Sequence, residues 1–168
     1  MGEFRLETQR LALRDWHDAD RAPFAAMNSD PAVMEFFPRP LLRAESDALV
    51  AMFQAELDEK GYCPWAVEDL STGAFIGFVG LHAVPAYMAF APGVEVGWRL
   101  AAPYWGHGYA SEAGAAALRF GFGTLELDEI VSFTSVVNLR SRRVMERLGM
   151  SRNEADDFDH PNIDERHP

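Results

Sequence analysis

The feature that most constrains this fold is a strand-like segment that runs through a glycine-containing turn directly into a helix-like segment. It covers residues 93–113 and reads GVEVGWRLAAPYWGHGYASEA. Its first part alternates strictly, which places apolar side chains on one face of a strand and Glu95 and Arg99 on the other. Gly106 and Gly108 permit a left-handed backbone, and the following helix N-terminus adds positive potential. The segment therefore indicates either a phosphate-binding turn or an ordinary strand-to-helix connection.

Composition limits the other possibilities. The chain has 168 residues, 48% of them hydrophobic, and contains neither a repeat nor a Gly/Ser linker, so we predict a single domain over residues 1–168. It carries 15 basic and 26 acidic residues, for a net charge of −11, and Lys60 is the only lysine. A general electrostatic attachment to nucleic acid is therefore excluded, and a cationic partner is favoured.

The sequence also bears on location. Its most apolar stretch, residues 74–98, is interrupted by Pro85 and Pro92 and by glycines, so we expect no membrane-spanning helix. Its first ten residues carry charge where a secretory signal needs an apolar core. The single cysteine, Cys63, agrees with a reducing compartment. We therefore expect a cytoplasmic protein, and we expect no metal site because no metal-ligand spacing is recognised.

Patterning predicts the remaining elements. A first strand is expected near residues 6–13, and helices are expected over 18–27, 31–37, 43–60, 110–122 and 138–148. Residues 62–70 and 74–81 flank a Ser-Thr-Gly turn and read as a β-hairpin, and residues 129–136 read as a β-branched strand. The order of elements predicts an α/β (α+β) fold with a mixed sheet.

A second motif lies at residues 133–150, FTSVVNLRSRRVMERLGM, where Asn138 and Ser141 open an amphipathic helix and Gly149 ends it. Together the two segments meet the pattern YWG-x-GYA-[ST]-EA, strand, N-x-x-S-x-x-V-M-E-[KR]-LGM almost in full. ETQRLALR at residues 7–14 and FDHP at residues 158–161 extend the match. The chain thus resembles the GNAT superfamily of acetyl-CoA-dependent N-acetyltransferases. Its pattern is most similar to the branch that contains the ribosomal-protein-alanine acetyltransferases.

The resemblance implies a fold and an activity. The implied fold is one domain with a mostly antiparallel, mixed sheet flanked by helices and a CoA cleft between central strands. The implied reaction moves an acetyl group from acetyl-CoA to a primary amine, a protein N-terminus or a small cationic amine, by direct attack in a ternary complex. The alternative is a CoA-binding regulatory module without turnover. A dinucleotide site fits less well, because Ser111 replaces the third glycine of G-x-G-x-x-G and the remaining chain is too short.

The resemblance also implies a donor site. Main-chain amides of residues 106–110 would hold the pyrophosphate of CoA, while backbone groups of residues 98–100 would bind the pantetheine arm and the thioester carbonyl. The arginines of the second motif would supply positive charge, or else form an exposed helix face. The expected cofactor contacts are Trp98, Arg99, Leu100, Trp105, Gly106, His107, Gly108, Tyr109, Ala110, Ser111, Asn138, Ser141 and Arg142.

Glu95 is the candidate general base, because it lies on the polar face of the strand expected to line the acyl group. Alternatively, it binds a cationic acceptor or pairs with Arg99. Met145 stands where many relatives place a proton-donating tyrosine, so water, Ser135 or Ser141 is expected to protonate the leaving thiolate. Glu112 is expected to support its helix N-terminus rather than to catalyse.

The acceptor site is expected near the helical segments before Gly61. Phe36, Trp65, His82 and Tyr87 are its candidate residues. Phe36, Phe37 and Trp65 either line an aromatic pocket or belong to the core.

Residues 151–168 form an acidic, loop-like tail where relatives have a closing strand. The resemblance also predicts a homodimer.

Overall fold

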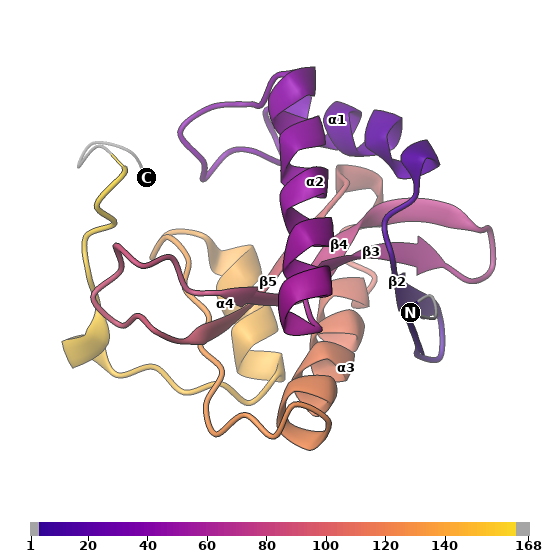
Figure 1. Cartoon of the computed structure of the whole chain (residues 1–168). Helices are drawn as coiled ribbons and strands as arrows, with labels where there is room; N and C mark the ends of the chain where they lie inside the picture. The colour runs from indigo at the N-terminus through magenta and orange to yellow at the C-terminus, as the bar shows by residue number, and fades with distance from the viewer. Residues whose placement is uncertain (1–3, 164–168) are drawn as a thin grey trace.

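The computed structural model describes residues 4–163 as a sheet with helices on both faces (Figure 1). The strands are β1 (Arg5–Glu7), β2 (Leu11–Arg14), β3 (Pro64–Asp69), β4 (Ala74–Ala83) and β5 (Val94–Leu100). The helices are α1 (Arg21–Ser29), α2 (Arg43–Lys60), α3 (Tyr109–Gly123) and α4 (Leu139–Arg147), with short 3₁₀ turns η1 (Asp18–Asp20), η2 (Ala102–Tyr104) and η3 (Glu154–Asp156). The five strands follow the order β1-β2-β3-β4-β5, and each neighbouring pair is antiparallel. The predicted fold class is confirmed.

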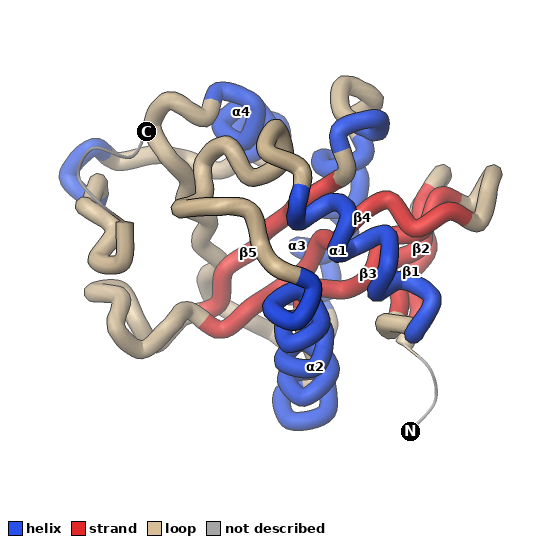
Figure 2. The backbone as a smooth tube through the Cα atoms, turned by 90° about the horizontal axis from the view of Figure 1, so that it is seen from above, coloured by secondary structure: helices blue, strands red, loops and turns tan. Residues whose placement is uncertain are grey.

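Two layers of helices enclose the sheet (Figure 2). On one face, Phe24 of α1 and Phe53 of α2 contact the ring of Phe78 on β4. On the other face, α3 approaches so closely that a Cβ at Gly121 would lie 3.1 Å from Leu81 of β4. Because side chains alternate along a strand, β5 directs Glu95 and Arg99 toward the α1 and α2 face and directs Trp98 toward the α3 face.

Several elements form where the sequence predicts them. The predicted helix over residues 43–60 is α2, and it ends at Gly61, whose φ of 77° is left-handed. The predicted hairpin is formed by β3 and β4, with Gly73 at φ 70° in its turn. The predicted helices over 18–27, 110–122 and 138–148 are found as η1 with α1, as α3 and as α4.

Two predictions near the N-terminus are wrong. The opening segment forms two short strands instead of one, because Thr8 closes a turn by bonding with Leu11, whose backbone N–H donates to the Thr8 hydroxyl at 3.0 Å. Residues 31–37 form consecutive turns instead of a helix. Asp30 does cap them, accepting a bond from the backbone N–H of Ala32 at 2.9 Å, but Pro38 follows and limits how far a helix can continue.

The prediction of a strand over residues 129–136 is also wrong, although one residue of this segment bridges to β5. Val131 forms a single parallel bridge with Glu95, in which its carbonyl accepts from Val96 N–H at 2.8 Å and its N–H donates to the Val94 carbonyl at 3.0 Å. Beyond this bridge no backbone hydrogen bond joins β5 to residues 132–136 of the described chain. The parallel part of the predicted mixed sheet is therefore reduced to one bridge.

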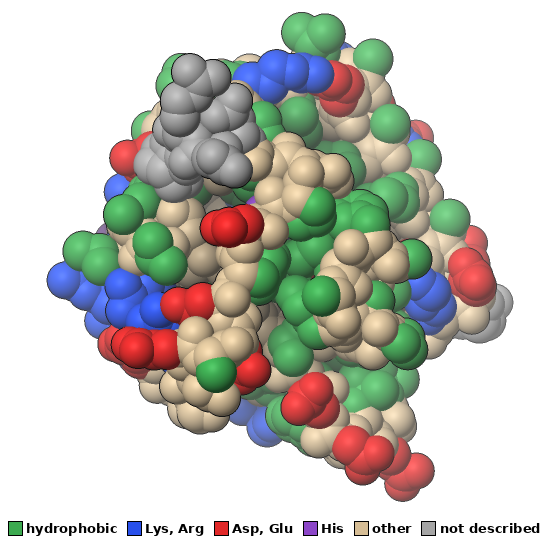
Figure 3. Space-filling view, turned by 90° about the vertical axis from the view of Figure 1, so that its left-hand side faces the viewer, with side chains coloured by type: hydrophobic (Ala, Val, Ile, Leu, Met, Phe, Trp, Pro, Cys, Tyr) green, Lys and Arg blue, Asp and Glu red, His purple; other side chains and the backbone are tan. Residues whose placement is uncertain are grey.

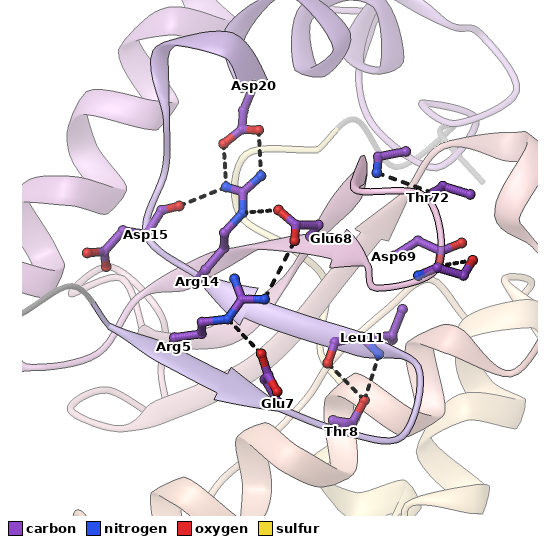
Figure 4. A network of polar contacts seen from close by, with 12 residues as sticks. Arg5, Glu7, Thr8, Leu11, Arg14, Asp15, Asp20, Glu68, Asp69 and Thr72 are labelled. Atoms are coloured by element: carbon purple, nitrogen blue, oxygen red, sulfur yellow. Dashed lines mark hydrogen bonds and ion pairs between the residues drawn. The ribbon is translucent and has the colours of Figure 1, made fainter.

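A buried ionic network joins the first strands to the connection before α1 (Figure 4). Arg14, only 4% exposed, pairs with Asp20 at 2.7 Å and with Glu68 of β3 at 2.8 Å. It also donates to the backbone carbonyl of Asp15. These carboxylates raise the pKa of Arg14, chiefly through the hydrogen bonds to Asp20, so the guanidinium stays charged.

The described part of the C-terminal segment, residues 151–163, is irregular except for η3. Phe158 packs against Phe90 and Phe133, and residues 164–168 lie outside the described part of the chain. Figure 3 shows the face that lies on the left in Figure 1. On this face hydrophobic side chains gather at the centre, and acidic side chains surround them. Among residues 4–163, no helix has the length and apolarity needed to span a bilayer.

Candidate active site

The glycine turn before α3 is the candidate phosphate-binding turn, and two of its glycines have a left-handed backbone. Gly106 and Gly108 have φ values of 79° and 81°, which favour glycine, and a Cβ at Gly106 would contact nothing within 4 Å. Backbone conformation, rather than crowding, therefore requires glycine at Gly106. Gly108 is the N-cap of α3, and no side chain caps this helix. The first-turn N–H groups of α3 are thus not bound by a capping side chain, which suits a phosphate.

A brace from the β1–β2 turn holds this loop in place. Glu112 of α3 accepts bonds from Thr8 Oγ1 at 2.6 Å, from the Arg10 backbone N–H at 2.9 Å and from Arg10 Nε at 2.7 Å. Arg10 also donates to the His107 carbonyl at 3.0 Å and lies 4.6 Å from the centre of the Tyr109 ring. Sequence reasoning missed Arg10, because nothing local links it to a helix about a hundred residues away. These contacts agree with the structural role expected of Glu112.

A second cluster lies on the edge of β5 opposite β4, beyond the Val131 bridge. Val96 N–H points away from β4 toward Val131, so alternation directs the N–H and C=O of Trp98 to the same open side. The Trp98 indole donates to Ser141 Oγ at 3.3 Å, and Asn138 Nδ2 donates to the same oxygen at 3.2 Å. The structure thus brings Trp98, Asn138 and Ser141 together, as the sequence motifs suggest.

Other predicted donor-site residues are held by the protein itself. The Trp105 indole donates to the Leu100 carbonyl at 2.8 Å. Arg140 lies 4.4 Å from the centre of the Trp105 ring and pairs with Glu35 at 2.7 Å. Arg142 donates to the Val136 carbonyl at 2.9 Å.

Ser111 lines a shallow cavity between α3 and α4. Its hydroxyl is buried and has no hydrogen-bond partner among the described residues. The cavity is about 590 Å³, and Arg119 and Arg147 contribute to its walls.

Glu95 is the most perturbed carboxyl group of the site. Burial raises its pKa to about 7, while the nearby His82 opposes this rise and Glu56 adds to it. His82 of β4 is paired with Glu95 of β5 in the antiparallel register, so the two side chains lie next to each other on the same face. No ion pair joins Glu95 to Arg99 in the described chain, so the alternative that the two residues pair is wrong.

His82 is fixed by Glu56, a buried carboxylate near the end of α2. Glu56 Oε2 lies 2.5 Å from His82 Nδ1, and Glu56 Oε1 accepts from the Ala83 N–H at 2.8 Å and from Lys60 at 3.2 Å. These groups line an open cavity of about 380 Å³. Glu56 was missed by sequence reasoning, although a charged residue on the buried face of a helix is a usable signal. Within residues 4–163, no group of three or more His, Cys, Asp or Glu side chains is arranged to hold a metal ion.

The predicted aromatic pocket is not assembled as expected. Trp65 is 0% exposed and stacks on Phe4 at 4.8 Å under α3, so its assignment to the acceptor site is wrong. Phe37 lies on the other side of the sheet, 4.2 Å from the Arg99 guanidinium. Phe36 lies near Arg140, and the exposed Tyr87 contacts the ring of His160. Among the four candidate acceptor residues, only His82 lies directly beside Glu95.

Comparisons with known proteins agree with this geometry. The family model described as an acetyltransferase (GNAT) domain matches residues 10–151. The uncharacterized protein YkkB of Bacillus subtilis is 34% identical over 87% of this chain and 84% of its own length. The uncharacterized N-acetyltransferase YoaA of the same organism is 28% identical over 88% of this chain and 82% of its own length.

The solved structures include an acetyltransferase from Agrobacterium tumefaciens that superposes with a TM-score of 0.79. It is 29% identical and aligns over 89% of this chain and 84% of its own. The match of the family model over residues 10–151 shows that the chain belongs to the GNAT family of acyl-CoA-dependent N-acetyltransferases.

Proposed function

We propose that this protein transfers an acetyl group from acetyl-CoA to a primary amine, a protein N-terminus or a small cationic amine, by direct attack in a ternary complex. The observation that carries the proposal is Glu95, a carboxyl group with a pKa of about 7 on β5, three residues before Trp98, where the edge of β5 has no strand partner among the described residues. Such a group can take a proton from an ammonium near neutral pH, whereas an exposed glutamate is a much weaker base. The net charge of −11 also favours an approaching cation.

The donor site is proposed to run from the glycine turn to the β5 edge. The N–H groups of residues 106–110 bind the pyrophosphate, and Arg10 keeps this turn in position. Trp98 presents its backbone N–H on the open side of β5, where it can bind the thioester carbonyl oxygen. Asn138 and Ser141 contact the pantetheine arm. The other predicted contacts, Trp105, His107, Tyr109, Ala110, Ser111 and Arg142, surround this path.

The reaction follows from these positions. The Glu95 carboxylate accepts a proton from the ammonium, directly or through a water molecule, and leaves a neutral amine. The amine nitrogen attacks the thioester carbon, and the negative charge that develops on the carbonyl oxygen is stabilised by the Trp98 N–H. The N–C bond forms, the nitrogen gives its surplus proton to water, and the C–S bond breaks. The products are the acetylated amine, the CoA thiolate and the proton taken up by water.

Ser141 is the proposed proton donor to this thiolate. Its oxygen already accepts bonds from Trp98 Nε1 and Asn138 Nδ2, so its own O–H is available to donate elsewhere. Met145 of α4 has no proton to give. Ser141 acts as a relay, because it receives a proton from water as it passes its own to the thiolate.

We further propose a cytoplasmic location, supported by the single, buried and unpaired Cys63. A homodimer and the ribosomal-protein-alanine acetyltransferase branch are proposed from the sequence resemblance.

Calorimetry with acetyl-CoA tests the donor site, with NADH as the control ligand. We expect micromolar binding by the wild type and at least a tenfold loss for Gly108→Asp, which places a carboxylate where the phosphate binds. Gly73→Asp is the matched control, because Gly73 has a similar φ of 70° in the distant β3–β4 turn. Equal binding by both variants would contradict the phosphate site. Amines are then screened for acetyl-CoA-dependent thiol release.

A further inference from the structure

Arg99 is an arginine held in a fixed orientation on the same face of β5 as Glu95. Its Cζ lies 4.2 Å from the ring centre of Phe37 and 5.3 Å from that of Phe78. Its Nη1 donates to Asn28 Oδ1 at 2.7 Å. Stacking on aromatic rings fixes the plane of a guanidinium and leaves its N–H edge to make hydrogen bonds.

This guanidinium lacks the partners that a buried arginine normally has. Arg99 Nε is buried without a hydrogen-bond partner, and no carboxylate of the described chain pairs with Arg99. Burial lowers its pKa to about 10, so it remains charged at neutral pH. Arg14 shows the contrast, because this same fold pairs it with both Asp20 and Glu68. An uncompensated, partly buried charge is costly to keep, which suggests that Arg99 has an anionic partner outside the chain.

The face of β5 between Glu95 and Arg99 is open. Gly97 occupies the position between them on the same face, and a Cβ there would contact nothing within 4 Å. Gly97 is not left-handed, so its backbone does not require glycine. The two charged residues therefore stand at the ends of an uncovered stretch of strand, with Cα atoms about 13 Å apart for four residues of extended chain.

We propose that the Arg99 guanidinium binds a carboxylate of the acceptor, so that the acceptor is an amino acid or another small amine that carries a carboxylate. This inference rests on the proposed function and narrows its acceptor. The carboxylate accepts hydrogen bonds from Arg99, and the body of the molecule lies over Gly97. The amine points toward Glu95 and passes its proton through water, because Glu95 and Arg99 are too far apart for one amino acid to contact both directly. A polyamine, which has no carboxylate, leaves Arg99 unpaired.

The test compares free L-amino acids with their C-terminal amides as acceptors, with spermidine as the polyamine, by acetyl-CoA-dependent thiol release. We expect at least one acid to exceed its amide tenfold or more in kcat/KM. The α-amine of an amino-acid amide is less basic than that of the free acid and is more often neutral. This difference in basicity favours the amide as acceptor, so it cannot produce the expected preference for the acid. Arg99→Gln is expected to reduce the preference to about twofold or less, and Arg99→Lys to retain part of it.

Two further variants separate recognition from folding. Gly97→Val is expected to raise KM for the preferred acid at least tenfold while leaving the Kd of acetyl-CoA within twofold, because its side chain enters only the acceptor space. Arg43→Gln removes the same charge from an exposed position on α2, where among the described residues it pairs only with Asp47, and is expected to change neither value. Circular dichroism melting establishes that each variant is folded.

A binding experiment tests the same inference without requiring the enzyme to turn over. With CoA present, calorimetry compares the N-acetyl derivative of each amino acid with the N-acetyl amide. Tighter binding of the acid that is lost in Arg99→Gln supports the inference. The inference is overturned if the wild type does not prefer the acid over the amide in either experiment, or if Arg99→Gln keeps that preference. Either result overturns it even when acetyl-CoA binds and amines are acetylated. If acetyl-CoA does not bind, the proposed function fails first and this inference fails with it.

Discussion

Glu95 shows how the surroundings of one residue set its chemistry. Burial raises its pKa to about 7, so it changes charge in the range where a base for an ammonium is useful. We expect kcat to rise with pH to a plateau, with a midpoint near 7. Glu95→Gln should lower kcat by about 10²-fold or more and flatten this profile, while the Kd of acetyl-CoA changes less than twofold. The measurement is the pH–rate profile of both proteins at saturating acetyl-CoA.

Folding stability provides the control for this variant. The pKa of Glu95 is raised from 4.5 to about 7 in the folded state, so the folded chain binds more protons than the unfolded chain within that range. This carboxyl group therefore makes the folded state less stable as pH rises through the range. Glu95→Gln removes the ionisation and should melt at a higher temperature than the wild type at pH 8, with a smaller difference at pH 4. If Glu95→Gln melted at a lower temperature than the wild type at both pH values, damage to the fold would explain its lost activity.

At the scale of elements, the β1–β2 turn and the start of α3 act as one unit through Glu112. Burial would raise the pKa of Glu112, yet hydrogen bonds from Thr8 and Arg10 hold it below its ordinary value. Glu112→Gln should cost about 1–2 kcal/mol of folding free energy and weaken acetyl-CoA binding, because Arg10 then holds the glycine turn less firmly. Arg10→Met should have the same effects, and the double variant little more. A shifted pH–rate profile in Glu112→Gln would instead indicate a catalytic role.

The elements that could be predicted from sequence are those whose determinants are local. Gly61 ends α2 because the residue just after the helix adopts a left-handed conformation, and that requirement is visible in a single position. Residues 129–136 have the composition of a strand, but a strand also needs a hydrogen-bonding neighbour, and only Val131 has one. The polar face of β5 was likewise visible from alternation. The brace by Arg10 was not, because it depends on how distant elements pack.

At the scale of the whole molecule, substitution of arginines with different partners should destabilise the fold to very different extents. Arg14 connects β2, η1 and β3 through Asp20 and Glu68, so Arg14→Met leaves buried carboxylates unpaired and should cost about 3–5 kcal/mol in urea unfolding. Arg43→Met, which breaks only an exposed pair with Asp47, should cost about 0.5 kcal/mol or less.

Folded Arg14→Met should still bind acetyl-CoA normally, because its network lies away from the glycine turn. Arg99→Gln leaves no carboxylate behind, so its loss should fall on acceptor selection and only weakly on stability. If Arg99→Gln proved as destabilising as Arg14→Met, Arg99 would be a packing residue, and the acceptor would have to be recognised without it.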